Sequence, residues 1–142
     1  MKSKYLKLFT ISLLAVGSIG LLGSQTASAA DLSRVHFEFR WNNPYDVSYR
    51  QVKNTTSGYY LKSNTVTVPW YSANAWGHSY KAVRTGNVDV SQNHTYKVRK
   101  NQTKNMYNKL VEWYGPGNNA YINSWSYSNG SGWGYWLSLI HI

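Results

Sequence analysis

Cysteine is absent from the 142 residues, and acidic residues are scarce, with 5 Asp and Glu against 15 Lys and Arg. Without cysteine the chain can form no disulfide and has no thiol nucleophile, so a small domain has to be held together by packing alone. Aromatic residues are abundant by contrast, with 7 Trp and 13 Tyr. All of the tryptophans lie beyond residue 30, and a small core cannot hide every ring, so part of this aromatic content is expected on the surface.

The first thirty residues have the three-part layout of a cleavable export signal. Three lysines within the first seven residues precede an uncharged, mostly apolar stretch over 8–22, and the small residues Ala27 and Ala29 follow. The apolar stretch is shorter than the roughly 20 residues that a membrane span prefers, which favours cleavage after residue 29 or 30 over an uncleaved anchor. We therefore expect residues 1–30 to be a signal peptide, similar to those of Gram-positive bacteria, and the protein to be secreted or attached to the cell surface.

Removal of this leader takes away three basic residues and no acidic one. The remainder carries 12 Lys and Arg against 5 Asp and Glu, a net charge of +7. A basic exported domain is attracted to anionic cell-wall polymers, to anionic lipid headgroups and to extracellular DNA, although the same charge is also typical of a merely solubilising surface. Among these partners we expect a wall polymer, a glycan or a membrane surface, and no specific nucleic acid.

Residues 35–41 alternate strictly, with Val35, Phe37 and Phe39 on one face and polar residues on the other, which predicts a half-buried strand. Further short segments rich in β-branched and aromatic residues lie between turn residues, at 46–53, 58–62, 65–70, 80–84, 88–90, 94–100 and 120–127. Residues 71–77 form a looser stretch. The pattern predicts one all-β domain over 31–136, a small antiparallel β-sandwich or barrel.

Residues 102–112 are compatible with two structures. Met106, Lys109, Leu110 and Trp113 have helical spacing, whereas residues 109–114 are also typical of a strand. We favour the strand because the neighbouring segments are strands. We also expect Trp41 and Trp113 to lie in the core.

The last six residues, 137–142, are apolar and contain neither a turn nor a charge. They are also the translation of CTG TCT CTT ATA CAC ATC, the end of a transposon-based sequencing adapter. We interpret them as translated adapter, with a natural gene that continues past Trp136; a genuine final strand is the alternative. Resequencing the locus with primers outside the gene decides between the two.

No catalytic constellation is evident in the sequence. Glycoside hydrolysis needs two placed carboxylates, and the pair to consider is Glu38 with Glu112. His36, His78 and His94 are widely spaced and lack the spacing of metal ligands. A serine nucleophile elbow and a phosphate-binding loop are also missing. We therefore expect a protein that is not an enzyme and that uses neither a metal nor a cofactor.

Two groups of residues are candidates for binding. The first is a basic segment that could hold a phosphate-bearing polymer, formed by Lys97, Arg99, Lys100, Lys104 and Lys109. The second is a set of rings that could stack on sugars or lie at a bilayer interface, formed by Trp70, Tyr71, Trp76, Trp125 and Trp133. A solvated surface is the alternative for the bases, and a buried core is the alternative for the rings.

The order of several short motifs resembles a known group. An early Phe37-Glu38-Phe39 strand is followed by Tyr49-Arg50, by late strands rich in Tyr and Asn, and by a closing Gly134-Tyr135-Trp136. This layout behind a signal peptide resembles the small secreted Gram-positive proteins of the domain of unknown function 2712 family. That family has no established activity, so the resemblance implies no functional residue. The chain is also similar to lactococcin-type bacteriocins, which are basic, rich in glycine and aromatic residues, and exported.

From these features we expect a secreted, non-catalytic β domain that associates with the anionic cell wall or with surface glycans. The alternative is a secreted antimicrobial, bacteriocin-like protein that acts on bacterial envelopes. A growth-inhibition assay against related strains separates the two, because only the second function predicts a zone of killing.

Overall fold

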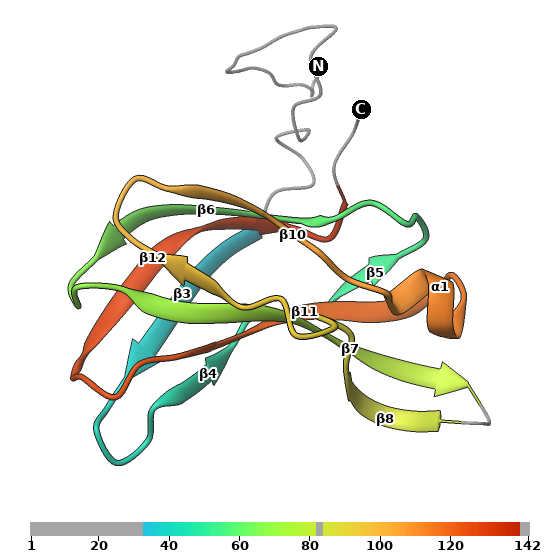
Figure 1. Ribbon diagram of the computed structural model, residues 1–142, viewed down its shortest axis with the longest axis horizontal. Helices are drawn as coiled ribbons and strands as arrows, with labels where there is room; N and C mark the ends of the chain where they lie inside the picture. The colour runs from blue at the N-terminus through green and yellow to red at the C-terminus, as the bar shows by residue number, and fades with distance from the viewer. Residues whose placement is uncertain (1–32, 82–83, 140–142) are drawn as a thin grey trace, which may run out of the picture. The chain divides into compact units, whose positions relative to one another are not determined.

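The strands of the chain pair into two antiparallel sheets, as Figure 1 shows for the computed structural model. The structure describes residues 33–81 and 84–139, so the predicted signal peptide at 1–30 lies outside the described residues. The smaller sheet has four strands in the order β10–β6–β12–β3. Its strands are β3 (Ser33–Phe39), β6 (Tyr59–Val66), β10 (Thr103–Met106) and β12 (Gly130–Leu137).

The larger sheet has six strands and is built around the pair β7 and β11. Both β4 and β5 pair with β11, and both β8 and β9 pair with β7. These strands are β4 (Tyr45–Val47), β5 (Gln51–Lys53), β7 (Tyr71–Lys81), β8 (Arg84–Asp89), β9 (Tyr96–Val98) and β11 (Asn118–Trp125). Within the described ranges α1 (Leu110–Tyr114) is the one helix. The prediction of a small all-β antiparallel fold is confirmed.

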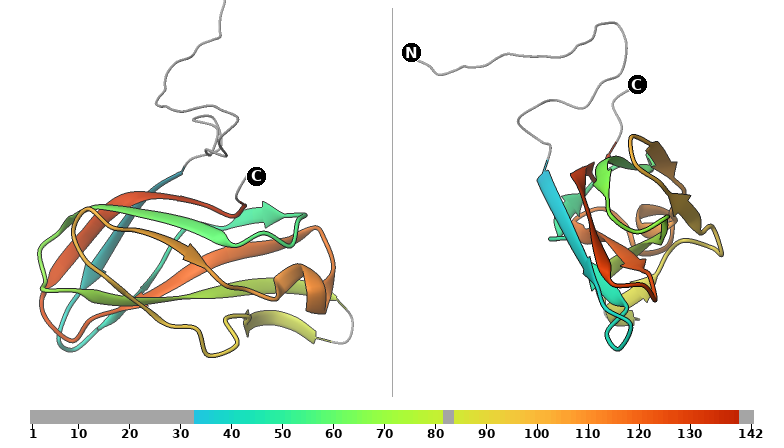
Figure 2. Two further views of the ribbon diagram at one scale, coloured as in Figure 1. Left: turned by 45° about the horizontal axis from the view of Figure 1, so that its top comes forward. Right: turned by 90° about the vertical axis from the view of Figure 1, so that its left-hand side faces the viewer.

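The core lies between the two sheets, which form the layers seen in Figure 2 and contribute side chains of different size. The four-stranded sheet supplies large, fully buried side chains, among them Phe37, Phe39, Leu61 and Trp136. The six-stranded sheet supplies three alanines, Ala73, Ala75 and Ala120, together with larger side chains such as Tyr71 and Ile122. Because protein interiors are packed about as densely as organic crystals, bulky residues in one layer fit over small residues in the other.

Gly134 of β12 lies where two strands approach more closely than a side chain allows. The pairing of β12 with β6 shifts register after Trp133, so that Asn64 of β6 is an extra residue without an opposite partner on β12. A Cβ atom on Gly134 would overlap the backbone carbonyl oxygen of Lys62 on β6. Only glycine fits at this β-bulge, and the bulge itself redirects the neighbouring side chains.

The helix α1 corrects the prediction of a strand over residues 109–114. After β10 ends, the side-chain oxygen of Asn108 accepts a hydrogen bond from the backbone N–H of Leu110 at 3.2 Å and turns the chain into the helix. Leu110 is fully buried, and its Cδ1 atom lies only 2.6 Å from the point where a Cβ on Gly77 of β7 would be. Because Gly77 has no side chain, β7 leaves room for Leu110 and the helix. The strand character of the neighbouring segments gave no sign of this contact.

Two tryptophans that the sequence places in the core are exposed, so that prediction is wrong. Trp41 is 70% exposed because β3 ends at Phe39 and a backbone bridge between Arg40 and Asn43 closes a turn around it. Trp113 lies on α1 and is 47% exposed. The alternation of apolar residues that predicts β3 includes one further apolar position, Trp41, which lies beyond the end of the strand at Phe39.

Two strand boundaries also differ from the expected ones. The single strand expected over 46–53 is divided into β4 and β5, because the two segments pair with β11 in registers that differ by one residue. The looser stretch expected over 71–77 is the first part of β7, the longest strand of the described chain. Its inward positions are held by small residues such as Ala73 and Ala75, which have little strand propensity of their own.

Two of the six C-terminal residues take part in the fold. Leu137 ends β12 and is buried. The backbone N–H of Ser138 donates to the side-chain oxygen of Gln51 at 2.8 Å, and its hydroxyl donates to the carbonyl of Val52 at 3.2 Å. Residues 140–142 lie outside the described residues. The backbone N–H of any residue at position 138 can donate to Gln51 in this way. The contact therefore does not test the adapter origin of 137–142, which stays a prediction.

Lys53 at the end of β5 is a fully buried cation. Its ammonium group donates hydrogen bonds to the carbonyl of Ser138 and to the hydroxyl of Ser57, and it lies 5.4 Å from the ring centroid of Tyr59. Burial lowers the pKa of Lys53 to about 8, an effect that the carboxylate of Glu112 partly opposes. The folded chain therefore holds this proton less tightly than the unfolded chain, in which the lysine pKa is near 10.5.

This difference predicts that stability rises between pH 8 and pH 10. In that window the unfolded chain keeps the Lys53 proton while the folded chain loses it, so the free energy of unfolding increases with pH, by about 2 kcal/mol for this one group. The variant Lys53→Met should lack the increase. Urea unfolding of both proteins at pH 8 and pH 10 measures the difference, and equal pH dependences would contradict the assignment.

Candidate functional site

A hollow of about 380 Å³ opens on the outer face of the four-stranded sheet. It is lined by residues of three neighbouring strands, namely Arg34, Asn64, Thr65, Trp133, Gly134 and Tyr135. We call it the Trp133 hollow. Strand alternation turns Trp133 and Tyr135 outward, because Trp136 on the same strand faces the core. The bulge at Asn64 separates β6 from its regular pairing at this point and so shapes the hollow.

Trp133 presents an indole ring whose position is fixed by a neighbour. In the strand register it lies between His36 of β3 and Thr65 of β6. The imidazole of His36 stacks on the indole, with the ring centroids 3.8 Å apart and the planes at 8°. Even so, Trp133 remains 43% exposed, so the indole is held in place and still accessible to a ligand.

Tyr135 occupies the next outward position and lies between two bases. In the register it is opposite Arg34 on β3 and Lys62 on β6. Among the described residues no carboxylate forms an ion pair with the guanidinium of Arg34. Both bases are exposed, and Arg34 lines the hollow, so the hollow combines ring surface with an exposed positive charge.

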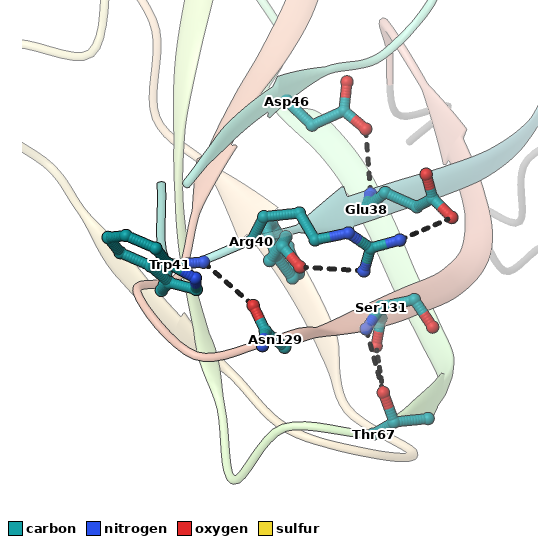
Figure 3. Close-up of polar contacts among 8 residues, drawn as sticks. Glu38, Arg40, Trp41, Asp46, Thr67, Asn129 and Ser131 are labelled. Carbon is teal, nitrogen blue, oxygen red and sulfur yellow. Dashed lines mark hydrogen bonds and ion pairs between the residues drawn. The ribbon is translucent and has the colours of Figure 1, made fainter. Parts of the chain in front are cut away.

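The Glu38 carboxylate on this face is already engaged. Glu38 of β3 lies opposite Ser131, one outward position from Trp133, and forms an ion pair with Arg40 at 3.9 Å (Figure 3). At this end of β12, the backbone N–H of Ser131 also donates a hydrogen bond to the side-chain hydroxyl of Thr67 at 2.8 Å. The acid therefore does not neutralise the bases beside Tyr135.

This arrangement can bind a saccharide that carries an anionic group. Flat indole and phenol rings offer apolar faces for the C–H surface of a sugar, and their polar edges remain hydrated. The guanidinium of Arg34 presents donors in a planar fork that suits a phosphate or a carboxylate. The amide of Asn64 and the hydroxyl of Thr65 add both donors and acceptors for sugar hydroxyls.

The basic segment predicted from the sequence begins at the edge of the other sheet. Lys97 lies on β9, and its ammonium nitrogen is 4.6 Å from the centroid of the Trp70 ring. Arg99 and Lys100 are exposed in the turn between β9 and β10. These three bases and Trp70 are neighbours, but none of them lines the Trp133 hollow.

The rest of that segment lies further along the fold. Lys104 is on β10 at the edge of the four-stranded sheet, and Lys109 precedes α1, where it pairs with Glu112 at 3.9 Å. Figures 1 and 2 place α1 at the end of the molecule opposite the turn between β9 and β10. The five bases are therefore spread along the molecule and do not form one compact patch.

The predicted aromatic set is also divided. Trp133 lines the hollow, whereas Trp76 and Trp125 are half-buried on the outer face of the six-stranded sheet. Tyr71 is a correction, since it is fully buried and its ring packs 5.6 Å from that of Phe37. Tyr71 points inward because it begins the core-facing row of β7, and so it cannot contact a ligand.

The outer face of the six-stranded sheet carries polar and aromatic side chains that are largely occupied with one another. The side-chain amides of Asn123 and Asn74 are joined by a hydrogen bond of 3.3 Å. The rings of Trp76 and Tyr121 lie 6.4 Å apart, and burial raises the pKa of Tyr121, an effect that the Arg50 guanidinium opposes.

The other titratable groups considered from the sequence are separate. Glu38 is on β3 and Glu112 is on α1, each beside a base of its own segment. Across residues 33–81 and 84–139 no cluster of three His, Asp or Glu side chains could hold a metal ion. The helices in that same part of the chain include none with the length and hydropathy needed to cross a membrane.

Sequence reasoning missed most of the residues that line the hollow. Arg34, Asn64 and Thr65 carry no motif, and they meet only because β3, β12 and β6 are neighbours in the sheet. The order of these strands is not encoded in any local pattern. The one available signal was the alternation of residues 131–137, which puts Trp133 and Tyr135 on one face.

Comparisons of the chain with protein-family models, with curated proteins and with solved structures gave no significant match. The resemblance to the domain of unknown function 2712 family therefore stays a prediction, and the functional argument depends on the geometry alone.

Proposed function

We propose that this chain is an exported, non-catalytic domain that binds anionic cell-wall polymers through the Trp133 hollow. The observation that carries the proposal is the combination, in one hollow, of an accessible indole braced by His36 and the guanidinium of Arg34, which forms no ion pair with a carboxylate of the described residues. The ligand class that suits both groups is a saccharide bearing a phosphate or a carboxylate.

The charge of the whole domain supports this choice. A net charge of +7 beyond the leader raises the local concentration of an anionic polymer around the protein. The bases outside the hollow, such as Arg99 and Lys100, add attraction along an extended polymer even though they do not line the hollow. The long-range part of the binding is therefore electrostatic, and the rings supply the short-range contact.

The test is retention of residues 31–142 on purified Gram-positive wall material across a salt series. We expect strong retention at low salt and a decline as ionic strength rises, because the screening length falls from about 10 Å at 0.1 M to about 3 Å at 1 M. Walls stripped of their phosphate polymers should retain less protein. Absence of retention at low salt would defeat the proposal.

A further inference from the structure

Six exposed apolar side chains lie along one edge of the six-stranded sheet, away from the Trp133 hollow. We call them the edge stripe, which consists of Trp41, Tyr45, Val47, Tyr49, Val52 and Tyr127. They account for most of the large exposed apolar side chains of the described chain. Monomeric soluble proteins rarely leave a patch of this kind uncovered, so the edge stripe requires an explanation.

The fold brings these residues together on one side of the sheet. Tyr45 and Val47 lie opposite Trp125 and Asn123 of β11, and all four point away from the core. Val52 on β5 continues the same edge, opposite Asn119.

Ring contacts join the strand edge to the loop after β11. The hydroxyls of Tyr45 and Tyr127 are 3.3 Å apart, and their rings meet edge to face at 6.5 Å. The ring of Tyr45 also lies 5.8 Å from that of Trp125. The stripe is thus continuous from the loop after β11 to the strand β4.

Trp41 extends the stripe at the turn between β3 and β4. Its backbone N–H donates to the side-chain oxygen of Asn129 at 2.9 Å, which fixes the turn against the loop that carries Tyr127. Figure 3 shows the indole of Trp41 directed away from the other labelled side chains. Trp41 is 70% exposed and Tyr49 is 85% exposed, so both rings are accessible to a partner.

Charges of both signs border the stripe. Arg40 and Arg50 flank it with exposed side chains, and Arg40 pairs with Glu38 at 3.9 Å. The carboxylate of Asp46 accepts hydrogen bonds from the backbone N–H groups of Glu38 at 2.8 Å and of Val47 at 2.9 Å, so it is tied to the fold. The stripe therefore presents apolar and aromatic side chains beside the exposed guanidinium of Arg50.

We infer that the edge stripe docks on an anionic lipid bilayer surface. Trp and Tyr prefer the boundary between headgroups and acyl chains, and the net charge of +7 beyond the leader attracts the domain to anionic headgroups. Aliphatic side chains such as Val47 and Val52 gain from burial in the acyl region but give a sugar nothing to recognise. A second copy is the less suitable occupant, because two surfaces with the same arginines and a net charge of +7 repel each other.

Vesicle binding tests this inference. Because the strands and the core of the described residues lie within 33–139, the experiment uses residues 31–142, which lack the predicted apolar leader. We expect cosedimentation with vesicles of phosphatidylglycerol and phosphatidylcholine, a blue shift of tryptophan emission, and much weaker binding to phosphatidylcholine alone. The double variant Trp41→Ser/Tyr49→Ser should bind anionic vesicles about a hundredfold less, since each of the two buried rings contributes on the order of 1.5 kcal/mol.

The matched control is Trp113→Ser/Tyr80→Ser, which removes one exposed Trp and one exposed Tyr elsewhere and should leave vesicle binding unchanged. Trp133→Ala should also bind vesicles normally, so failure of this inference and failure of the proposed wall binding are distinguishable. The inference is overturned if the leader-free chain ignores anionic vesicles, or if the Trp41 and Tyr49 variant binds like the parent. A dimer in sedimentation equilibrium that the same variant abolishes would overturn it in favour of a second copy.

Discussion

Replacing Gly134 with alanine is expected to destabilise the domain more than any other single methyl group added to its surface strands. The new Cβ would overlap the carbonyl oxygen of Lys62, which belongs to the backbone and cannot rotate away. β12 or β6 has to shift, and overpacking of this kind costs about 3 kcal/mol. For a domain of this size the melting temperature should fall by roughly 10 to 20 °C, as measured by circular dichroism.

Ser131→Ala is the control for that experiment. Ser131 lies on the same strand, and its hydrogen bonds to Thr67 use backbone atoms that the substitution retains. Its melting temperature should stay within a few degrees of the parent. If Gly134→Ala melts like Ser131→Ala, the close approach of β12 to β6 is not a feature of the protein in solution.

Replacing Trp133 with alanine is expected to abolish most of the binding to wall polymers. The substitution removes the ring that lines the hollow and leaves His36 without its stacking partner. Loss of a central aromatic contact typically costs about 2 kcal/mol, so the affinity should fall by more than tenfold. Because Trp133 is on the outer face of the sheet, the fold should survive, and retention on wall material measures the effect directly.

Trp113→Ala provides the matched comparison. It removes an equally exposed tryptophan from α1, far from the hollow, and keeps the net charge unchanged. Its retention should equal that of the parent at every salt concentration. Equal losses in both variants would mean that the rings act without regard to position, and the assignment of the hollow would fail.

The type of fold could be predicted from the sequence because its evidence is local. The alternation of Val35, Phe37 and Phe39 does describe β3, and glycine- or asparagine-rich turns do separate most of the strands. The errors came where a contact between distant segments decides the structure. Leu110 forms a helix because it packs where Gly77 has no side chain, and neither residue reveals this alone.

The site was less predictable than the fold for the same reason. Trp133 was identified as a binding ring, but Arg34 lies about a hundred positions earlier and reaches Tyr135 only through the pairing of β3 with β12. The prediction of one basic cluster was wrong for the converse reason, because residues that are close in sequence lie apart in the fold. Lys97 and Lys109 are close in sequence, yet they belong to different parts of the fold. Sheet order, which local patterns do not encode, determines both results.

The two proposed surfaces would act together on an exported protein. The Trp133 hollow lies on the outer face of one sheet, and the edge stripe lies along the edge of the other. One would hold a wall polymer, and the other would rest on a lipid surface. Because no residue is shared between them, each can be removed while the other is measured.

NMR of residues 31–142 tests most directly whether the Trp133 hollow recognises an anionic saccharide. Residues 31–142 labelled with ¹⁵N are titrated with soluble, phosphate-bearing wall fragments at low salt. The account predicts saturable shifts of the Trp133 indole N–H and of backbone amides around Arg34, Asn64 and Tyr135, with the Trp113 indole unmoved. Shifts confined to other residues, or none at all, would contradict it.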